Sequence, residues 1–473
     1  PGVEPQGDLG NLKWEIRSFR YLGVQVYHDV LDRLEGNLGA AIRALKASMS
    51  FWGTLPLSVA GRIALIKMIA LPRLLYFFGT LPMWIPRAIF REIDSLCIAF
   101  IWGPGRRRVA LHILQRPTKD GGMAVPDFEA YYLAAQLQWY TQWISCRLEP
   151  EQGWNQSMPE LQELVTVLLG IGRLQGAIPN EFKVIRQCWN RCLRKTGTRI
   201  PYSPEIPIRM LTSLPHNWDW RHLQNWAELG VTKMGDLYRE GALLPFEELS
   251  QEFGLPQGDF LLHRAITAAI KKHWRSGLVE PPAHCSTQYI ATAAGRVKAV
   301  TCLYRRIRQD ALEPLQALRL WWEGSLGIPL DDKAWSIILE RAPKLIRNAR
   351  FRLIHFYAIH HAYLSPDKIN QYFALTDTSC PRCGEIGANF IHMIWACPHL
   401  LSYWLDITDS LGEITLGDNP CTPAHCLLHW FRHTAKTKVT NKFLDLALVL
   451  AKREIARNWK SSTALRWHYG EES

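Results

Sequence analysis

A short stretch that carries cysteine and histidine constrains this chain more than any other part of its sequence. Cys380 and Cys383 are separated by two residues, and His392 and Cys397 follow in the same stretch. Three thiolates and one imidazole are a usual donor set for structural zinc. Because four protein ligands leave no open position on the ion, we predict a closed zinc site that stabilises the fold and does not activate water.

The spacing of the last two ligands limits the local structure. His392 and Cys397 are five residues apart, which would turn them about 140° away from each other on a straight α-helix. We therefore expect the chain to leave such a helix between them, with Pro398 starting a new helix. Arg382 would help to offset the negative charge of three thiolates around Zn²⁺. Two alternatives remain at this point: reduced cysteines and a histidine in an apolar core, or a site in which His399 replaces His392.

The length and composition favour a large protein with a polyanionic partner. The chain has 473 residues, of which 48% are hydrophobic, so about three domains with sizeable cores are expected. Its net charge of +12 suits nucleic acid as the first candidate partner. Its 11 cysteines lack the regular spacing of a disulfide framework, which favours a reducing compartment.

The N-terminus and the most apolar run of the chain bear on targeting. The first residues contain neither a start methionine nor a signal peptide, so we expect a piece of a longer protein. The most apolar run, residues 63–90, is interrupted by Lys67, Pro72 and other breaking or charged residues. We therefore expect no segment of the length of a clean membrane span and no membrane partner.

Helical spacing of apolar residues dominates the sequence, so we predict a mostly α, multi-domain fold. Glycine, proline and acidic residues interrupt the pattern near residue 150, and a Glu-Pro-Pro sequence interrupts it again near residue 285. The predicted parts are a helical first region at 1–150, a helical middle region at 151–285 with at most a few short strands, and a helical C-terminal domain at 286–473 around the zinc site.

Local signals predict individual elements. Partial alternation around Gly23 predicts strands or a hairpin within residues 14–27. Ser58 is a candidate N-cap for a helix that would end at Leu71, with Pro72 starting another. Further helices are expected from about Asp29 to Gly53, from Arg87 to Trp102, from Phe128 onward, from Leu400 to Leu411 and from Lys442 to Lys460.

Basic residues gather in three clusters that can contact phosphates, although each can equally be a solvated face. The third cluster has three-residue spacing, which predicts a gradually rotating basic stripe on one helix. The candidate nucleic-acid contacts are Arg106, Arg107 and Arg108, then Arg305, Arg306 and Arg308, then Arg341, Lys344, Arg347 and Arg350.

Several short motifs occur in a specific order along nearly the whole chain. They are Tyr21-Leu22-Gly23, Gly61-Arg62, Leu71-Pro72, Phe100-Ile101-Trp102, the run from Lys119 to Asp127, the run from Trp226 to Phe253, the Cys/His stretch, Ala451-Lys452-Arg453 and Asn458-Trp459-Lys460. In this order they resemble the reverse transcriptases of LINE-type non-LTR retrotransposons, from the thumb onward. The chain looks like the C-terminal half of the second open reading frame of a vertebrate LINE.

The resemblance implies a parent RNA-directed DNA polymerase whose catalytic palm and endonuclease lie outside this chain. This piece would hold template RNA and RNA–DNA hybrid during target-primed reverse transcription, joined to the upstream palm, in a nuclear and cytoplasmic ribonucleoprotein. The resemblance places Arg62 and Lys67 on the thumb beside the template–primer duplex. The knuckle departs from the pattern of mammalian members by one residue on each side of Cys383, which points to another clade and leaves the zinc prediction unchanged.

Two other classes of function compete with this one. The abundant tryptophans and the missing palm are also compatible with a structural or protein-interaction module derived from a retrotransposon. A metal-dependent nuclease would need a carboxylate cluster; Asp331 and Asp332 form an Asp-Asp pair, but we expect them to start a helix. A second group of metal-binding residue types is expected to form a polar helix face rather than a metal site: Cys421, His425, Cys426, His429 and His433.

Overall fold

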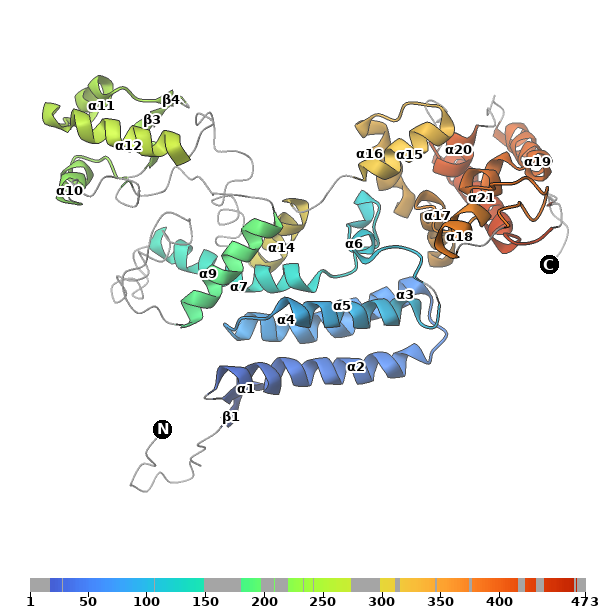
Figure 1. The fold of residues 1–473 in the computed structure, drawn as a ribbon, viewed down its shortest axis with the longest axis horizontal. Helices are drawn as coiled ribbons and strands as arrows, with labels where there is room; N and C mark the ends of the chain where they lie inside the picture. Colours follow the sequence, from blue (N-terminus) through green and yellow to red (C-terminus); the bar gives the residue numbers. More distant parts are fainter. Residues whose placement is uncertain are drawn as a thin grey trace. The chain divides into compact units, whose positions relative to one another are not determined.

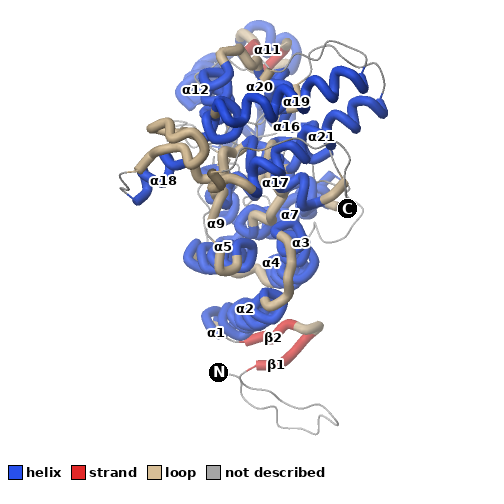
Figure 2. The backbone as a smooth tube through the Cα atoms, turned by 90° about the vertical axis from the view of Figure 1, so that its right-hand side faces the viewer, coloured by secondary structure: helices blue, strands red, loops and turns tan. Residues whose placement is uncertain are grey.

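The protein is mostly α-helical, as predicted (Figures 1 and 2). The strands among the described residues form two short antiparallel pairs. The computed structural model describes residues 18–27, 29–105, 107–148, 180–196, 208, 220–232, 234–240, 242–273, 298–310, 315–344, 347–373, 377–415, 422–430, 438–462 and 465.

The chain divides into two compact units, and each is assembled from separate stretches of sequence. Unit 1 comprises residues 1–44, 72–91 and 127–312, and unit 2 comprises residues 45–71, 92–126 and 313–473. The sequence boundaries expected near 150 and 285 both fall outside the described residues, so the three-part division stays a prediction.

A β-hairpin begins the described part of unit 1, as the alternation predicted. β1 (Ser18–Tyr21) pairs with β2 (Val24–Tyr27), and both Leu22 and Gly23 have positive φ, as a tight two-residue turn requires. The next helix forms α1 (Val30–Leu34), a π-helical turn (Glu35–Gly39) and α2 (Ala40–Gly53), close to the predicted span. Buried Asn37 ties the hairpin to it: its amide accepts from the Gln25 N–H at 2.8 Å and donates to the Gln25 carbonyl at 2.7 Å.

The next helix is longer than predicted. Ser58 caps α3 (Val59–Leu65) as expected, with its hydroxyl accepting from the Gly61 N–H. A π-helical segment (Ile66–Ala70) then leads directly into α4 (Leu71–Thr80), so the prediction of a helix end at Leu71 is wrong. The wide π turn ends at Ala70, two residues before Pro72, whose ring has no N–H for an α-helical bond, and the helix continues through this position without a break.

This long helix also corrects the expectation that no segment has the length of a membrane span. By length and composition alone, Val59–Thr80 is sufficient to cross a membrane, and it is the one such helix among the described residues. Core helices pass the same test, and one side of this helix is buried in protein. The buried residues are Ile63, Ile66, Ala70, Leu74 and Phe78. α5 (Arg87–Trp102) follows with the predicted bounds.

A three-helix arrangement organises the rest of unit 1. α7 (Phe128–Leu148) packs against α9 (Asn180–Lys195) and α14 (Ala299–Asp310). Buried Asp127 caps α7 through the Ala130 N–H and also binds Lys195 at 3.1 Å and Arg308 at 2.8 Å. Burial alone would raise the pKa of this carboxyl, but the two cations outweigh it and lower the pKa.

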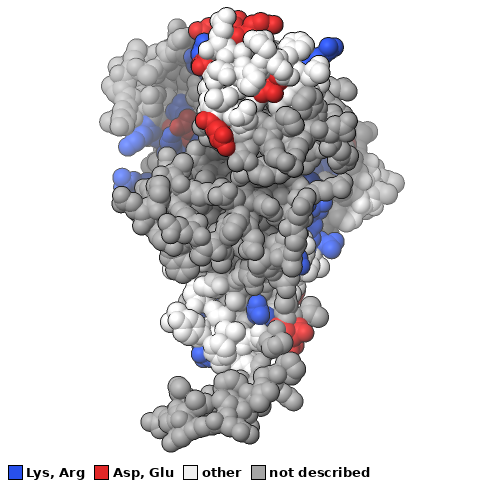
Figure 3. All heavy atoms as spheres, turned by 90° about the vertical axis from the view of Figure 1, so that its left-hand side faces the viewer, with Lys and Arg blue, Asp and Glu red and all other residues white. Residues whose placement is uncertain are grey.

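The middle region has a small core of its own. It contains α10 (Trp220–Glu228), a 3₁₀ turn (Met234–Leu237), β3 (Tyr238–Arg239), β4 (Ala242–Leu243), α11 (Phe246–Phe253), a second 3₁₀ turn (Gln257–Asp259) and α12 (Phe260–His273). These short helices and strands match the prediction. Trp226 is fully buried, and its indole N–H donates to Asp259 at 2.9 Å. Exposed glutamates gather on this part, several of them in α11, and Figure 3 shows acidic side chains on its visible face.

Unit 2 holds the C-terminal helices together with two earlier stretches. The earlier stretches contribute α3, α6 (Leu111–Leu114) and a 3₁₀ turn (Thr118–Asp120). The later elements are α15 (Gln316–Leu326), α16 (Asp332–Arg341), a 3₁₀ turn (Ala342–Lys344), α17 (Ala349–Ile359), α18 (Pro366–Phe373), a π turn (His392–Ala396), α19 (Pro398–Thr415), α20 (Pro423–Leu428) and α21 (Lys438–Arg457). Asp331 caps α16 through the Ala334 N–H, as predicted for this Asp-Asp pair.

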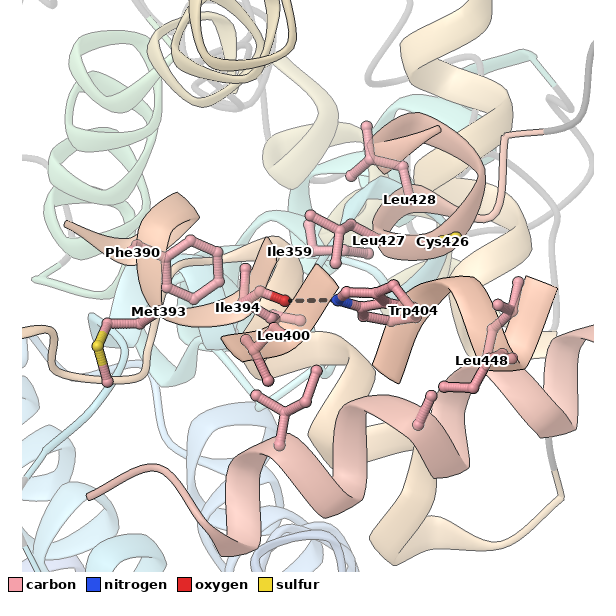
Figure 4. Close-up of a cluster of buried hydrophobic side chains, with 14 of the residues drawn as sticks. Ile359, Phe390, Met393, Ile394, Leu400, Trp404, Cys426, Leu427, Leu428 and Leu448 are labelled. Carbon is pink, nitrogen blue, oxygen red and sulfur yellow. Dashed lines mark hydrogen bonds between the residues drawn. The ribbon is translucent and has the colours of Figure 1, made fainter. Parts of the chain in front are cut away.

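Buried tryptophans organise the core of unit 2 (Figure 4). The indole N–H of Trp404 donates to the Ile394 carbonyl at 3.1 Å, and that of Trp322 donates to the Ile359 carbonyl at 3.0 Å. Both side chains are fully buried, so each ring fills core volume while its single polar atom stays paired.

Truncating Trp404 is therefore expected to destabilise unit 2. Trp404→Ala should lower the free energy of unfolding by about 3–5 kcal/mol, because it removes a large buried ring and leaves a cavity. Leu401→Ala on the same helix is the control, since Leu401 is 58% exposed and should change stability little. Urea unfolding followed by far-UV circular dichroism measures both; equal midpoints would contradict the assignment of Trp404 to the core.

Candidate functional site

The four predicted ligands converge into one compact group that can hold a metal ion. The donor atoms of Cys380, Cys383, His392 and Cys397 all lie within 4.8 Å of one another. The sulfurs of Cys380 and Cys397 are 3.9 Å apart, and the Cys383 sulfur lies 3.3 Å from Nε2 of His392. The sulfur separation fits the range expected when two thiolates bind one ion with metal–sulfur bonds of about 2.3 Å.

The knuckle that carries the first two cysteines is built by the backbone. The N–H of Cys380 donates to the Glu385 carbonyl at 2.8 Å, and the N–H of Gly384 donates back to the Cys380 carbonyl at 2.9 Å. Gly384 has a φ of +78°, which a residue without Cβ adopts at little cost. The turn thus points both thiols of the Cys-x-x-Cys sequence toward the same point.

A π-helical turn positions the other two ligands. His392 starts the π turn, and the N–H of Cys397 donates to the His392 carbonyl at 3.0 Å, five residues back. This wide turn brings together two residues that a straight α-helix would separate, so the expectation that they do not share one is confirmed. Pro398 then begins α19, as predicted.

The surroundings of the cluster fix the histidine and the arginine. Nδ1 of His392 lies 3.3 Å from a Glu385 carboxylate oxygen, which leaves Nε2 directed at the sulfurs. Arg382 is buried, as a compensating charge would require, but its guanidinium donates to the Met393 carbonyl at 2.8 Å and to the Asn458 carbonyl at 3.4 Å. His399 is exposed and lies outside the four-residue group.

The second Cys/His group does not form the polar helix face that the sequence suggested. His429 and Cys426 are buried, and His425 bonds the hydroxyl of Thr422, the N-cap of α20. The remaining two members of the group, at 421 and 433, lie outside the described residues.

Instead, His429 belongs to a buried charged network that sequence reasoning missed. The ammonium of Lys452, a residue only 1% exposed, lies 2.6 Å from Nε2 of His429, 2.9 Å from Nδ1 of His355 and 3.1 Å from the Leu427 carbonyl. Nδ1 of His429 in turn contacts Asp445 at 2.9 Å. A Lys ammonium has three donors, and this site supplies three acceptors.

Arg341 closes the network from α16. Its guanidinium binds both oxygens of Asp445 at 3.0 Å. Burial, Lys452 and Arg341 together lower the pKa of His429, and burial, Lys452 and His429 do the same for His355. Both imidazoles therefore stay neutral and accept from Lys452, whose own pKa burial lowers to about 7. The one feature of the sequence that could have indicated this network is a lysine, Lys452, within the apolar pattern of α21.

Several predicted nucleic-acid contacts are hydrogen-bonded within the protein. Arg62 donates to the Phe100 carbonyl at 2.7 Å, and Lys67 donates to the Met123 carbonyl at 3.3 Å. Arg308 is paired with Asp127, as described above. Both thumb-like residues stay half-buried, so their predicted role at a duplex remains untested.

The predicted basic stripe is not on one helix. Arg341 ends α16 and is paired with Asp445, Lys344 lies in the following 3₁₀ turn and binds Glu340, and Arg347 precedes the start of α17, in which Arg350 lies. Pro343 and Asn348 explain why the helix is interrupted. Proline is unfavourable inside a helix, and Asn348 caps the start of the next one, α17.

The remaining candidates differ in exposure. Arg107, Arg108, Arg305, Arg347 and Arg350 are exposed, Arg306 is half-buried, and Arg106 lies outside the described residues. The Arg108 guanidinium lies over the rings of Tyr357 and Tyr363, 5.2 and 5.9 Å from their centres. The exposed arginines are therefore the members of the predicted set that can reach phosphate.

A search of protein-family models finds none that matches this chain.

The Lys452 network predicts that unit 2 loses stability as the pH falls. The pKa of Lys452 is lowered from 10.5 to about 7, so above pH 7 the unfolded chain binds more protons than the folded one. Stability should then decrease from about pH 10 toward pH 7, and the lowered pKa values of His355 and His429 should extend the decrease below pH 6.5.

Thermal unfolding at pH 9.5 and pH 7.5 compares two points inside that interval, and substitution identifies the part that belongs to Lys452. Lys452→Met should lower the unfolding temperature at both pH values, because it leaves buried acceptors unpaired, and should flatten its pH dependence. Lys442→Met, at an exposed position on the same helix, should keep the slope of the unchanged protein. If the unfolding temperature of Lys452→Met depended on pH as strongly as that of the unchanged protein, the titrating group would be another residue.

Proposed function

We propose that this chain is the nucleic-acid-binding, non-catalytic C-terminal part of a LINE-type reverse transcriptase, which grips template RNA and RNA–DNA hybrid. The observation that carries the proposal is the convergence of three cysteines and one histidine in a helical unit that also bears exposed arginines. The order of the family motifs along the sequence and the net charge of +12 support it.

Exposed arginines in unit 2 are the candidates for contacts with phosphate. Arg107 and Arg108 follow α5, and Arg347 and Arg350 flank the Asn348 cap of α17. These four side chains are exposed, whereas Arg341 is bound to a carboxylate. Because each arginine that neutralises a phosphate releases counterions, binding through them depends steeply on salt.

Substituting two of these arginines should change the salt dependence of RNA binding. Arg347→Ala with Arg350→Ala should reduce the slope of log K against log salt by about 1.4 for a single strand, from about 0.7 for each lost contact. Fluorescence anisotropy with a single-stranded RNA and with an RNA–DNA hybrid measures the slope. Arg239→Ala is the matched control, since that exposed arginine is already paired with Glu252.

Two outcomes separate the proposal from its competitors. An unchanged slope in the double variant would move the phosphate contacts to other residues. Absence of salt-dependent binding to either probe by the unchanged protein would contradict nucleic-acid binding altogether.

We further propose that the bound metal is zinc in a structural role. Three sulfurs and one nitrogen form a soft donor set that suits Zn²⁺, and four protein ligands complete a tetrahedron. Zinc would link the knuckle to the π turn and thereby to the start of α19. Its contribution to RNA binding is then indirect, through the fold of unit 2.

Removing one ligand tests this role. The purified protein should contain about one zinc per chain, and Cys383→Ser should lose it, destabilise unit 2 and weaken RNA binding. Cys302→Ser, outside the cluster and in unit 1, should keep the metal. Elemental analysis of folded protein is the measurement; a folded, metal-free preparation would leave the stretch as an apolar corner with reduced cysteines.

A specific feature favours a second function, binding of another protein. α19 exposes Leu401 and Leu405, and α21 exposes Phe443 and Leu446. Exposed apolar side chains on neighbouring helices can form a contact surface for another protein. Recovery of a protein partner after nuclease treatment, lost in Leu401→Ser with Leu405→Ser, would favour this function over nucleic-acid binding.

A further inference from the structure

A pocket of about 240 Å³ lies within unit 2, apart from the metal cluster. Its walls come from α3 and the π segment after it, from the turn at residues 118–123, and from α16, α17 and the 3₁₀ turn between them. The pocket is thus built by stretches of chain that are far apart in sequence and belong to the same unit.

One part of the pocket wall is apolar and partly aromatic. Ile63, Leu353 and Phe356 line it, and the Phe356 ring is 4.5 Å from the His360 ring, centre to centre. Burial lowers the pKa of His360 to about 4, so the imidazole is neutral at physiological pH. This wall can receive the face of a flat, unsaturated ring.

The charged lining residues are all cations. Lys67 and Arg352 line the pocket, and no carboxylate does. The Lys67 amine donates to the Met123 carbonyl at 3.3 Å, and Arg352 donates to the Pro343 carbonyl at 3.5 Å. An ammonium has three donors and a guanidinium five, so one bond each leaves both groups able to bind an anion.

The turn beside the pocket is held in one shape. Gly121 has a φ of +78°, and a Cβ on Gly122 would lie 2.1 Å from the Arg116 carbonyl oxygen. The imidazole Nε2 of His360 lies 2.7 Å from the Gly121 carbonyl oxygen, which ties α17 to this turn. The wall is therefore preformed, which reduces the cost of ordering it around a ligand.

We propose that this pocket binds one nucleotide, with the base against Phe356 and the phosphate at Lys67 and Arg352. A ring-shaped apolar body joined to an anion is the chemistry that these walls select. The proposal rests on the proposed function for its preferred source, an unpaired nucleotide of bound RNA. A free mononucleotide carries the same chemistry.

The test uses the full chain with two probes, a single-stranded oligoribonucleotide and AMP. Phe356→Leu keeps an apolar side chain but removes the aromatic face, so it should weaken oligonucleotide binding by about 5- to 150-fold without changing the salt slope. Phe351→Leu, on the same helix but outside the pocket, should bind as the unchanged protein does. Lys67→Met should lower the salt slope by about 0.7.

Ala64→Phe is a second variant that does not depend on altering the core, because Ala64 is exposed and lines the pocket. It should abolish binding of AMP and weaken binding of the oligoribonucleotide. AMP binding that Ala64→Phe abolishes, without RNA binding by the unchanged protein, would support the pocket and overturn the proposed function. An RNA affinity that neither Ala64→Phe nor Phe356→Leu changes would overturn the pocket and leave the proposed function standing. Failure of the unchanged protein to bind either probe would overturn both.

Discussion

One buried lysine side chain constrains how the C-terminal helices pack against one another. Lys452 cannot be placed in a dry core without acceptors for its protons, and unit 2 supplies them from His355, His429 and the Leu427 carbonyl. The acceptors lie on α17 and around the end of α20, while Asp445 on α21 and Arg341 on α16 hold His429 in place. Four helices therefore meet at one polar point, and their relative register cannot shift without leaving a buried donor or acceptor unpaired.

This network and the metal cluster connect different elements of unit 2. The cluster joins a knuckle and a π turn through four convergent side chains, whereas the network lies where α17, α20 and α21 already pack closely. The same unit contains the tryptophan core, in which Trp322 and Trp404 each pair their single polar atom with a carbonyl. Apolar filling combined with these specific polar pairs favours one arrangement over loosely packed alternatives.

Sequence patterns predicted the elements and ligands that depend on the spacing of neighbouring residues. The hairpin at Gly23, the Ser58 cap, α5 and the four ligands each follow from residues close to one another along the chain. The missed ion pairs and the missed buried lysine share a physical cause, since each depends on residues distant in sequence. Pairing of Arg341 with Asp445, of Arg308 with Asp127 and the burial of Lys452 are decided by tertiary packing, which charge counts cannot reveal. The helix through Pro72 was missed because a π turn has no clear sequence signature.

The division of each unit into separate stretches has a consequence for synthesis on the ribosome. Residues 45–71 and 92–126 emerge early, yet the unit to which they belong is completed only by residues 313–473. Ile63, for example, lines the pocket together with Leu353 and Phe356, which are translated nearly 300 residues later. During that interval the nascent chain exposes apolar surface that is prone to aggregation. Chaperone binding and translation speed should therefore govern the yield of folded protein more than its final stability does.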